Sequence, residues 1–358
     1  MSVFAMAGGG TGGHVIPALA VARELRDRGH EAVFFGTRKG FEAKLAPAAG
    51  FPIEWIEAGA LNRTGWRQAL RSLGTLPASV AHCLKLMRKY RPQAVFSMGG
   101  YVAGPVVMAA ILRRIPIVAM EPNAMPGLTN RWIGRFVARA LLSFEETARY
   151  FPKGRTEITG LPVRKEFFAI APREPGEMTT VLITGGSRGA RSLNQAARES
   201  WPYIRESGLR VRILHQTGGD AYEQIAREFP ASGVAGEVMP FIDDMPAAFA
   251  KADLVVCRSG AGAVAEVAAA GKPAILVPFP YAADNHQFHN AEALYRLGAA
   301  RLVRDAELNG RRLFDEIRSL AEHPRDMQEM GERARAFAHP GAAKRAADLL
   351  EELELRRH

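Results

Sequence analysis

The stretch Asp253-Leu-Val-Val-Cys-Arg-Ser-Gly-Ala-Gly-Ala-Val-Ala-Glu266 is followed by Gly271-Lys-Pro-Ala-Ile-Leu-Val-Pro-Phe279 and then by Asp284-Asn-His-Gln287. Its short apolar runs are bounded by glycine and proline, which is typical of buried strands. The small residues between the two runs lead into a helical segment. The pattern predicts a strand, a tight turn, a helix, a second strand and a polar loop, which is an element of a parallel α/β sheet.

The small side chains of residues 259–263 allow a ligand to lie against the backbone where the predicted helix begins. Free N–H groups and the helix dipole favour an anion at that point. Glu266 follows about one turn into the helix, within reach of a sugar diol beside a phosphate. A phosphate-binding helix N-terminus, a carboxylate that can accept hydrogen bonds from a sugar diol and a polar loop together predict a nucleotide-sugar site.

The same order of elements starts twice along the chain. An apolar strand at 2–7, a glycine loop at Gly8–Gly13 and a helix at 15–28 are matched by a strand at 179–184, a loop at Gly185–Gly189 and a helix at 190–200. Strands and helices alternate after each start, which predicts two doubly wound domains with parallel sheets. The other expected strands are 32–35, 94–97, 115–120, 211–215, 254–257 and 274–278.

The domain boundary is expected near residues 159–163, giving domains at 1–162 and 163–340. Residues 171–178 read as a loop containing proline and glycine. In doubly wound sheets, ligands bind outside the carboxyl ends of the strands. The three glycine loops, at 8–13, 99–104 and 185–189, each follow a strand and are therefore expected to line one cleft between the domains.

The first glycine loop satisfies the G-x-G-x-x-G pattern of dinucleotide sites. That pattern also requires an acidic residue at the end of the second strand. Here the second strand ends in Phe34-Phe35-Gly36-Thr37, and Glu31 lies at its other end. An NAD site is therefore disfavoured, and the close approach of a diphosphate explains the glycines better.

His14 opens the helix after this loop and is either a packing or capping residue or a general base. A helix N-terminus disfavours the protonated imidazole, which keeps the ring ready to accept a proton. Glu121 and Asn123, on the proline-containing segment 121–127, are either turn residues or ligands of sugar hydroxyls. Ser187 and Arg188 are either part of a helix cap or ligands of a diphosphate.

Three other polar groups favour structural roles. Arg258 is expected to form an ion pair. Asp243 and Asp244 are expected to cap a helix rather than bind a divalent metal. No group of His, Cys and carboxylate residues has metal-site spacing. Cys83 and Cys257 lie in apolar surroundings without CxxC spacing, which fits a reducing compartment.

Composition places the chain among globular proteins, with 358 residues, 47% hydrophobic and 23% charged. No secretory signal is recognised, because the apolar run at 3–7 passes directly into glycines. The longest weakly polar run, 98–112, is too short for a membrane span and contains three glycines and a proline.

The net charge of +10 is concentrated in one segment, since residues 58–120 contain no Asp or Glu. A basic surface with exposed apolar groups binds anionic membranes, which is the interpretation we favour. The alternatives are a solvated basic face or a nucleic-acid site, and no nucleic-acid motif accompanies the charge. The nine basic residues are Arg63, Arg67, Arg71, Lys85, Arg88, Lys89, Arg91, Arg113 and Arg114, and the interleaved apolar residues are Trp66, Leu70, Leu73, Leu76, Val80, Leu84 and Met87.

Taken together, these segments resemble the MurG-type N-acetylglucosaminyltransferases, which complete the lipid-linked disaccharide of peptidoglycan. The resemblance spans the chain in a consistent order and is more specific than any single glycine loop. The matching segments are GGGTGGHVIPALAVA (8–22), GGYVAGP (99–105), EPNAMPGLTNR (121–131), TGLPVR (159–164), TGGSRGARSLN (184–194), FIDDM (241–245), CRSGAGAVAE (257–266) and DNHQ (284–287).

The resemblance implies a B-type glycosyltransferase fold: two Rossmann-like domains facing a central cleft, with a C-terminal helix at 341–358 returning to the first. It implies UDP-N-acetylglucosamine as the donor, held mainly by the second domain. The implied acceptor is undecaprenyl-diphosphate-linked N-acetylmuramoyl-pentapeptide, bound by the first domain at the cytoplasmic face of the plasma membrane. It implies no required cofactor, no tightly bound metal and no nucleic-acid partner.

Residue roles carried over from the family are expectations of the resemblance. His14 and Glu121 are the implied catalytic residues, the backbone of Ile242 is implied to meet uracil, and Glu266 the ribose. The implied donor-binding residues are Thr11, Gly12, Gly13, Asn123, Arg164, Ser187, Ile242, Ala261, Gly262, Ala263, Val264, Ala265, Glu266, His286 and Gln287, and the implied acceptor-binding residues are Gly10, Gly100 and Tyr101.

Two positions depart from the family pattern. Gly262-Ala263 stands where Leu-Thr is frequent, so a hydroxyl contact to phosphate is missing, and His286 stands where many members have Gln. Three alternative functions remain open: a UDP-N-acetylglucosamine 2-epimerase, a transferase to another lipid acceptor such as diacylglycerol, and a non-enzymatic sensor of nucleotide sugars. The acid-free basic segment argues against the epimerase, which needs no lipid surface.

Overall fold

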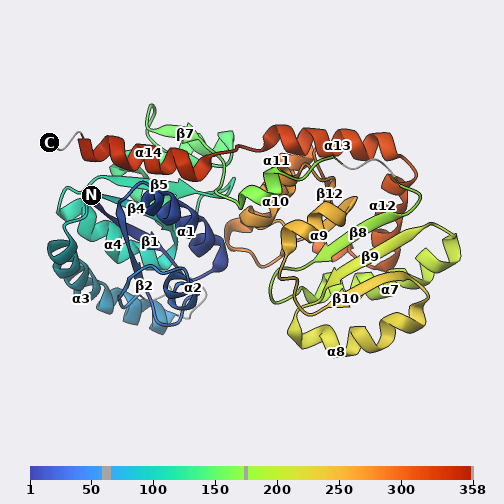
Figure 1. Cartoon of the computed structure of the whole chain (residues 1–358). Coiled ribbons are helices and arrows are strands. Elements are labelled where there is room, and N and C mark those ends of the chain that lie inside the picture. The colour runs from blue at the N-terminus through green and yellow to red at the C-terminus, as the bar shows by residue number, and fades with distance from the viewer. Residues whose placement is uncertain (59–65, 173–175, 356–358) are drawn as a thin grey trace. The chain divides into compact units, whose positions relative to one another are not determined.

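The computed structural model of the chain describes residues 1–58, 66–172 and 176–355, without the side chains of 66–74. It divides into two compact units (Figure 1). Unit 1 comprises Met1–Val163 and His339–His358, and unit 2 comprises Arg164–Ala338. Each unit contains one parallel sheet with helices packed on it, as predicted for two doubly wound domains.

The sheet of unit 1 has seven parallel strands in the order β3-β2-β1-β4-β5-β6-β7. The chain starts at the central strand and moves outward in both directions, the mark of a doubly wound sheet. The elements are β1 (Val3–Gly8), α1 (Gly12–Asp27), β2 (Glu31–Gly36), α2 (Glu42–Ala48), β3 (Ile53–Trp55), α3 (Trp66–Tyr90), β4 (Ala94–Gly99), α4 (Gly100–Leu112), β5 (Ile117–Glu121), α5 (Leu128–Ile133), η1 (Gly134–Phe136), β6 (Arg139–Leu142), η2 (Glu145–Tyr150), β7 (Thr156–Ile158) and α14 (Ala342–Leu355).

The sheet of unit 2 has six parallel strands in the order β10-β9-β8-β11-β12-β13. The elements are α6 (Lys165–Phe168), β8 (Thr179–Thr184), α7 (Arg191–Ser207), β9 (Val211–Gln216), α8 (Gly219–Glu228), η3 (Phe229–Ser232), β10 (Ala235–Met239), α9 (Met245–Lys251), β11 (Leu254–Cys257), α10 (Ala261–Ala270), β12 (Ala274–Leu276), η4 (Ala283–Asn285), α11 (His286–Arg296), β13 (Arg301–Leu302), η5 (Asp305–Glu307), α12 (Gly310–Ala321) and α13 (Pro324–Phe337).

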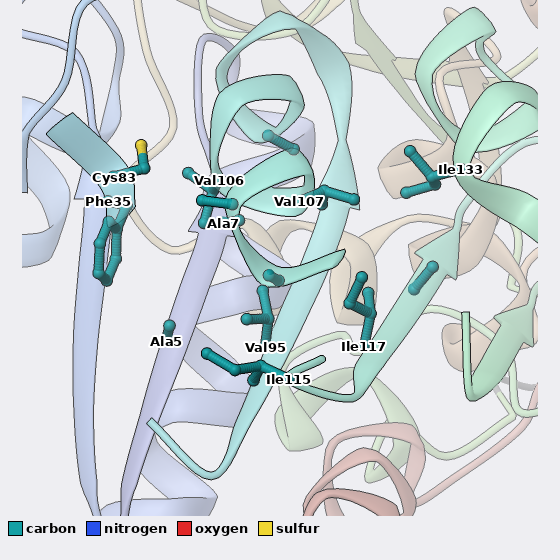
Figure 2. Packing of buried hydrophobic residues seen from close by; sticks show 14 of the residues in the cluster. Ala5, Ala7, Phe35, Cys83, Val95, Val106, Val107, Ile115, Ile117 and Ile133 are labelled. Atoms are coloured by element: carbon teal, nitrogen blue, oxygen red, sulfur yellow. The ribbon is translucent and has the colours of Figure 1, made fainter. Parts of the chain in front are cut away.

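The core of unit 1 follows from the two-residue period of its strands. Ala5 and Ala7 of β1 point to the face that α3 and α4 cover, where they meet Val95 and Val106 (Figure 2). Phe4 and Met6 are equally buried on the opposite face, on which α1 packs. Both faces of the sheet are therefore covered, which is why its central strands are almost continuously apolar.

The apolar residues of helix α3 were expected to be exposed, and for the four that the structure describes this prediction is wrong. Val80 and Met87 are buried and Leu76 and Leu84 are partly buried, all packed in the core of unit 1. These four residues are therefore core residues and not an exposed apolar stripe. The side chains of Trp66, Arg67, Leu70, Arg71 and Leu73, together with Arg63, lie outside the described residues.

The C-terminal helix α14 packs on unit 1, where it contacts α1, β4 and β5 (Figure 1). Arg28, at the end of α1, donates hydrogen bonds to Asp348 and Glu351 of α14, both at 2.7 Å. Arg345 of α14 pairs with Glu157 of β7. These charged contacts fasten the last helix to the domain that contains the start of the chain.

Candidate functional site

The first glycine loop, between β1 and α1, is built around a residue that the sequence analysis did not single out. Glu42 is fully buried, and one of its carboxylate oxygens accepts the backbone N–H of Gly10 at 2.8 Å. The other accepts the N–H and the hydroxyl of Thr37, both at 2.9 Å. A Cβ atom on Gly9 would lie 2.6 Å from this carboxylate, so the Gly9 position is required by internal packing.

The next glycines of this loop differ in their surroundings. Gly10 has a φ of +87° and faces the ring of Tyr101, which a Cβ atom there would approach to 2.8 Å. Gly12 and Gly13 have open space beside them: their nearest neighbours would lie at 3.8 and 3.9 Å from an added Cβ. A ligand could therefore approach the backbone at Gly12 and Gly13, whereas Gly10 is closed by the protein itself.

His14 lies on the first turn of α1 and is half-buried. Its Nδ1 is 3.3 Å from the Thr11 hydroxyl, and its ring lies against Gly100, where an added Cβ would come within 3.4 Å of Nδ1. The prediction of a loop at 99–104 is wrong, because β4 ends at Gly99 and α4 begins directly at Gly100. The structure thus brings together four predicted residues of unit 1: His14, Gly10, Gly100 and Tyr101.

Glu121 ends β5, and its carboxylate organises the segment that follows. One oxygen accepts the backbone N–H and the side-chain amide of Asn123, at 3.0 and 3.2 Å. The other accepts the N–H of Gly127 at 3.1 Å and the amide of Asn130 at 2.9 Å. Burial raises the pKa of Glu121 to about 7, against the lowering effect of these bonds.

Asn130 connects this segment to the start of α4. Its amide also donates to the carbonyl of Met120, and its side-chain oxygen would meet a Cβ atom on Gly99 at 2.7 Å. The neighbouring Thr129 donates its hydroxyl to the carbonyl of Gly100. Glu121 is therefore tied through Asn130 and Thr129 to the glycine pair that His14 touches.

In unit 2, the glycine loop after β8 is closed by packing at both ends, at Gly185 and Gly189, and is open in the middle. A Cβ atom on Gly189 would overlap the Thr217 carbonyl oxygen, and Gly189 has a φ of +74°. Gly186, with a φ of +84°, has no neighbour beside it. The exposed Ser187 lies between them. Space for an anion therefore exists at Gly186–Ser187 but not at Gly189.

Gln216, at the end of β9, is a second residue that sequence reasoning missed. Its buried amide group donates to the carbonyl of Gly186 at 2.9 Å, and its oxygen accepts the backbone N–H of Ile242 at 2.8 Å. It therefore joins the loop after β8 to the segment after β10. The backbone of Ile242 is implied to meet uracil. Its N–H is engaged by Gln216, so its carbonyl oxygen is the backbone atom that could meet a base.

The helix α10 begins at Ala261 with Gly260 as its N-cap and has no side-chain cap. Gly262 has no neighbour beside its Cα, so its backbone is accessible. Gln287 lies next to Gly260: its carbonyl accepts the Ser259 hydroxyl at 2.7 Å, and its side chain accepts the N–H of Phe279. The predicted turn and polar loop thus meet at the start of α10.

Glu266 of α10 and Arg164 interact electrostatically. The apolar surroundings of Glu266 raise the pKa of its carboxyl to about 7, and the positive charge of Arg164 acts in the opposite direction. Arg164 itself is exposed and lies over the ring of Phe167. His286 opens α11, and its Nδ1 is 2.8 Å from the carbonyl of Ala283.

Two structural roles expected from sequence are confirmed. Arg258 pairs with Asp305 at 2.5 Å and also donates to Ser192 and the carbonyls of Val277 and Pro278. Asp244 is the N-cap of α9 and accepts the N–H of Ala247 at 3.0 Å.

The described residues contain neither a metal-ligand cluster nor a membrane-spanning helix. No three His, Cys, Asp or Glu side chains in 1–58, 66–172 and 176–355 gather as metal ligands would. In the same part of the chain, no helix has the length and apolar character needed to span a membrane.

The chain matches known families along both units. Residues 4–142 match the glycosyltransferase family 28 N-terminal domain, and residues 180–352 match its C-terminal domain. The chain is 61% identical to a protein of Solibacter usitatus named UDP-N-acetylglucosamine–N-acetylmuramyl-(pentapeptide) pyrophosphoryl-undecaprenol N-acetylglucosamine transferase, over 98% of this chain and 96% of the other. The chain belongs to the MurG-type enzymes of glycosyltransferase family 28.

Solved structures agree with membership of the MurG-type family. The crystal structure of Acinetobacter baumannii MurG has a TM-score of 0.82 and 31% identity, covering 98% of this chain and all of that one. A UDP-N-acetylglucosamine 2-epimerase from Neisseria meningitidis has a TM-score of 0.69 at 13% identity, covering 98% and 100% of the two chains, a likeness of fold alone. This MurG-type chain is therefore a glycosyltransferase with the predicted B-type fold.

The packing of the glycine loop after β8 gives a stability prediction for unit 2. Gly189→Ala is expected to reduce the free energy of unfolding of unit 2 by about 2–4 kcal/mol, because the new methyl group overlaps a carbonyl and the left-handed backbone is strained. Urea unfolding followed by circular dichroism measures this. Gly219→Ala is the matched control, since Gly219 begins α8 with open space beside it. Equal stability of the two variants would contradict the packing argument.

Proposed function

We propose that this enzyme transfers N-acetylglucosamine from UDP-N-acetylglucosamine to the muramoyl 4-hydroxyl of undecaprenyl-diphosphate-linked N-acetylmuramoyl-pentapeptide, with inversion at the anomeric carbon. The observation that carries this proposal is 61% identity, over almost the whole chain, to a relative named for that reaction. The product is the lipid-linked disaccharide used in peptidoglycan synthesis. UDP-N-acetylglucosamine is a substrate, and the proposal includes no cofactor and no tightly bound metal.

Unit 2 is the proposed donor site. The open backbone at Gly186–Ser187 and at the N-terminus of α10 offers N–H groups to the diphosphate. Glu266, one turn into α10, accepts hydrogen bonds from the ribose hydroxyls, and the carbonyl of Ile242 faces the base. Gln287 and His286 contact the sugar. Arg164, Ala261, Ala263, Val264 and Ala265 complete the proposed donor-binding residues of unit 2.

Unit 1 supplies the proposed base and acceptor site. His14 takes the proton from the muramoyl hydroxyl, whose oxygen forms the new bond to the anomeric carbon as the bond from that carbon to the diphosphate breaks. UDP leaves with its added charge stabilised by the N–H groups at the start of α10. Thr11, Gly12, Gly13 and Asn123, on unit 1, are also proposed donor-binding residues. Gly100 and Tyr101 are the proposed acceptor residues, and Gly10 is proposed to act through Tyr101, against whose ring it packs.

Two observations support His14 over Glu121 as the base. His14 is half-buried beside open glycine backbone, so its ring is accessible. Each oxygen of Glu121 already accepts two hydrogen bonds inside the protein. We therefore propose that Glu121 holds the 121–130 segment, and thereby Asn123, in place.

The function is tested by mass spectrometry of the product from UDP-N-acetylglucosamine and a short-chain polyprenyl-diphosphate muramoyl-pentapeptide. Addition of one N-acetylhexosamine is expected. His14→Ala should reduce turnover about 10²–10⁴-fold, the usual contribution of a general base. His82→Ala, at an exposed position of α3, is the control. Transfer only to diacylglycerol, or epimerisation without any acceptor, would replace the proposal by the corresponding alternative.

The raised pKa of Glu266 gives a pH prediction for donor binding. Above about pH 7 the carboxyl is ionised and accepts both ribose hydroxyls strongly, whereas below that pH it is protonated. The KM for UDP-N-acetylglucosamine should therefore rise as pH falls from about 8 to about 6. Glu266→Gln should raise this KM at least about tenfold at the higher pH and remove the dependence.

Glu223→Gln, at an exposed position of α8, should leave the pH profile of KM as in the unaltered enzyme. A Glu266→Gln enzyme with unchanged KM at both pH values would remove Glu266 from donor binding.

We further propose that unit 1 binds the cytoplasmic face of an anionic plasma membrane as a peripheral protein. Leu128, Trp132 and Phe136 are exposed and spaced four residues apart along α5 and η1. Trp132 packs against Phe136, and the guanidinium of Arg135 lies over the Phe136 ring. Exposed aromatic rings beside a positive charge are suited to an anionic lipid surface.

The double variant Trp132→Ser/Phe136→Ser should reduce binding to phosphatidylglycerol-containing vesicles at least about tenfold, because each ring contributes about 1.5–3 kcal/mol when transferred from water. UDP binding should not change. Vesicle co-sedimentation measures the first effect and calorimetry the second. The control is Tyr295→Ser/Leu297→Ser, which removes two exposed apolar side chains from unit 2. If the Trp132→Ser/Phe136→Ser variant bound vesicles as well as the unaltered enzyme, these rings would not form the membrane-binding surface.

A further inference from the structure

The buried carboxylate of Glu42 has no role in the proposed chemistry so far. Glu42 is the first residue of α2 and is fully inaccessible to solvent. Acidic residues at the start of a helix ordinarily face solvent and the N–H groups of their own helix. The Glu42 carboxylate instead accepts hydrogen bonds from Gly10 and Thr37, in the loops that follow β1 and β2.

Three glycines form the space that this side chain fills. A Cβ atom on Gly9 would lie 2.6 Å from a carboxylate oxygen of Glu42, and one on Gly36 would lie 2.5 Å from its Cγ. A Cβ atom on Gly40 would overlap the carboxylate itself. The turns after β1 and β2 and the start of α2 are therefore shaped around one side chain.

The carboxylate acts as an acceptor in all three of these contacts. An apolar side chain of equal volume would fill the space but leave the N–H groups of Gly10 and Thr37 without a partner. Burial of such unpaired groups costs about 1–3 kcal/mol each. The loop can reach its observed conformation without that cost because the carboxylate is present.

The Gly10 N–H, which Glu42 holds, lies four residues before the proposed base His14. Gly10 is kept at a φ of +87° between the carboxylate of Glu42 and the ring of Tyr101. The backbone then passes through Thr11, whose carbonyl accepts the N–H of His14 at 3.1 Å. The position of Gly10 therefore sets where α1 begins and where the His14 ring lies relative to Gly100.

We infer that Glu42 is a positioning residue for the transfer: its buried carboxylate fixes the first glycine loop so that His14 is presented to the acceptor hydroxyl. This inference rests on the proposed function, in which His14 is the base. In the described part of the chain, the hydrogen bonds of Glu42 go to Gly10 and Thr37, so Glu42 acts on His14 through the loop.

The test compares Glu42→Gln with the unaltered enzyme in the product assay. The amide presents an N–H group to donors on one side, so the contact with Gly10 or with Thr37 is lost and the loop shifts. Displacement of a catalytic group by about 1 Å can cost about 10²-fold in rate. We expect kcat to fall about 10- to 100-fold on this basis, with KM for UDP-N-acetylglucosamine within about twofold because the proposed donor site is built mainly from unit 2.

A second variant approaches the same contact from the other side. Gly9→Ala keeps the carboxylate but places a methyl group against it, so kcat should fall in the same way. Glu42→Asp, which keeps the charge with a shorter reach, should recover part of the lost rate. Glu157→Gln is the control, because it removes an ion pair with Arg345 in the same unit away from the glycine loop.

Glu157→Gln should lower the melting temperature of unit 1 while leaving kcat within about twofold, since a partly exposed ion pair contributes about 1 kcal/mol or less. Folded Glu42→Gln or Gly9→Ala enzymes with unaltered kcat would overturn the inference. The inference would also be overturned if Glu157→Gln lowered kcat as much as Glu42→Gln does for the same loss of stability. Failure of the unaltered enzyme to form product would instead reject the proposed function.

Discussion

In both units the chain must turn from a buried parallel strand into a helix within a few residues, and the backbone there touches other parts of the protein. Gly9 and Gly10 meet Glu42 and Tyr101, Gly99 meets Asn130, and Gly189 meets the backbone of Thr217. A Cβ atom at any of these positions would displace its neighbour. The direction in which each following helix leaves the sheet, and so the place of every residue on its first turn, depends on this close approach.

This constraint separates two uses of glycine that look alike in a sequence. The closed positions are occupied by the protein's own groups and shape the loops. The open positions, Gly12, Gly13, Gly186 and Gly262, leave backbone accessible. At these open positions a ligand can lie against the main chain. In a run of glycines after a strand, some positions are therefore required for the loop to pack, and others leave its backbone accessible to a ligand.

The central strands of both sheets could be predicted from the sequence, whereas the outer strands could not. The expected strands form β2-β1-β4-β5 and β9-β8-β11-β12, which are covered on both faces and therefore almost continuously apolar. The missed strands β3, β6, β7, β10 and β13 lie at or toward the sheet edges, are short, and are less apolar. Their pairing is decided by neighbouring strands and leaves little local signal.

The candidate site shows the same division. His14, Glu266 and the small-residue turn at the start of α10 could be recognised because their signals are local. Glu42 and Gln216 could not, because their importance comes mainly from contacts with Gly10, Gly186 and Ile242, which are distant in sequence. The expectation of exposed apolar groups in the acid-free segment was wrong for Leu76, Val80, Leu84 and Met87, because these residues face the core. Exposed aromatic rings occur at Trp132 and Phe136.

The contact between Arg28 and helix α14 has a consequence for biosynthesis. Unit 1 is interrupted by the whole of unit 2, so its last helix leaves the ribosome only after unit 2 has been made. Until then Arg28 lacks Asp348 and Glu351, and the surface of α1 that α14 covers stays open to water or to chaperones. Unit 2, which is continuous in the chain, can complete its own sheet earlier, so the order of maturation is the reverse of the order in which translation begins.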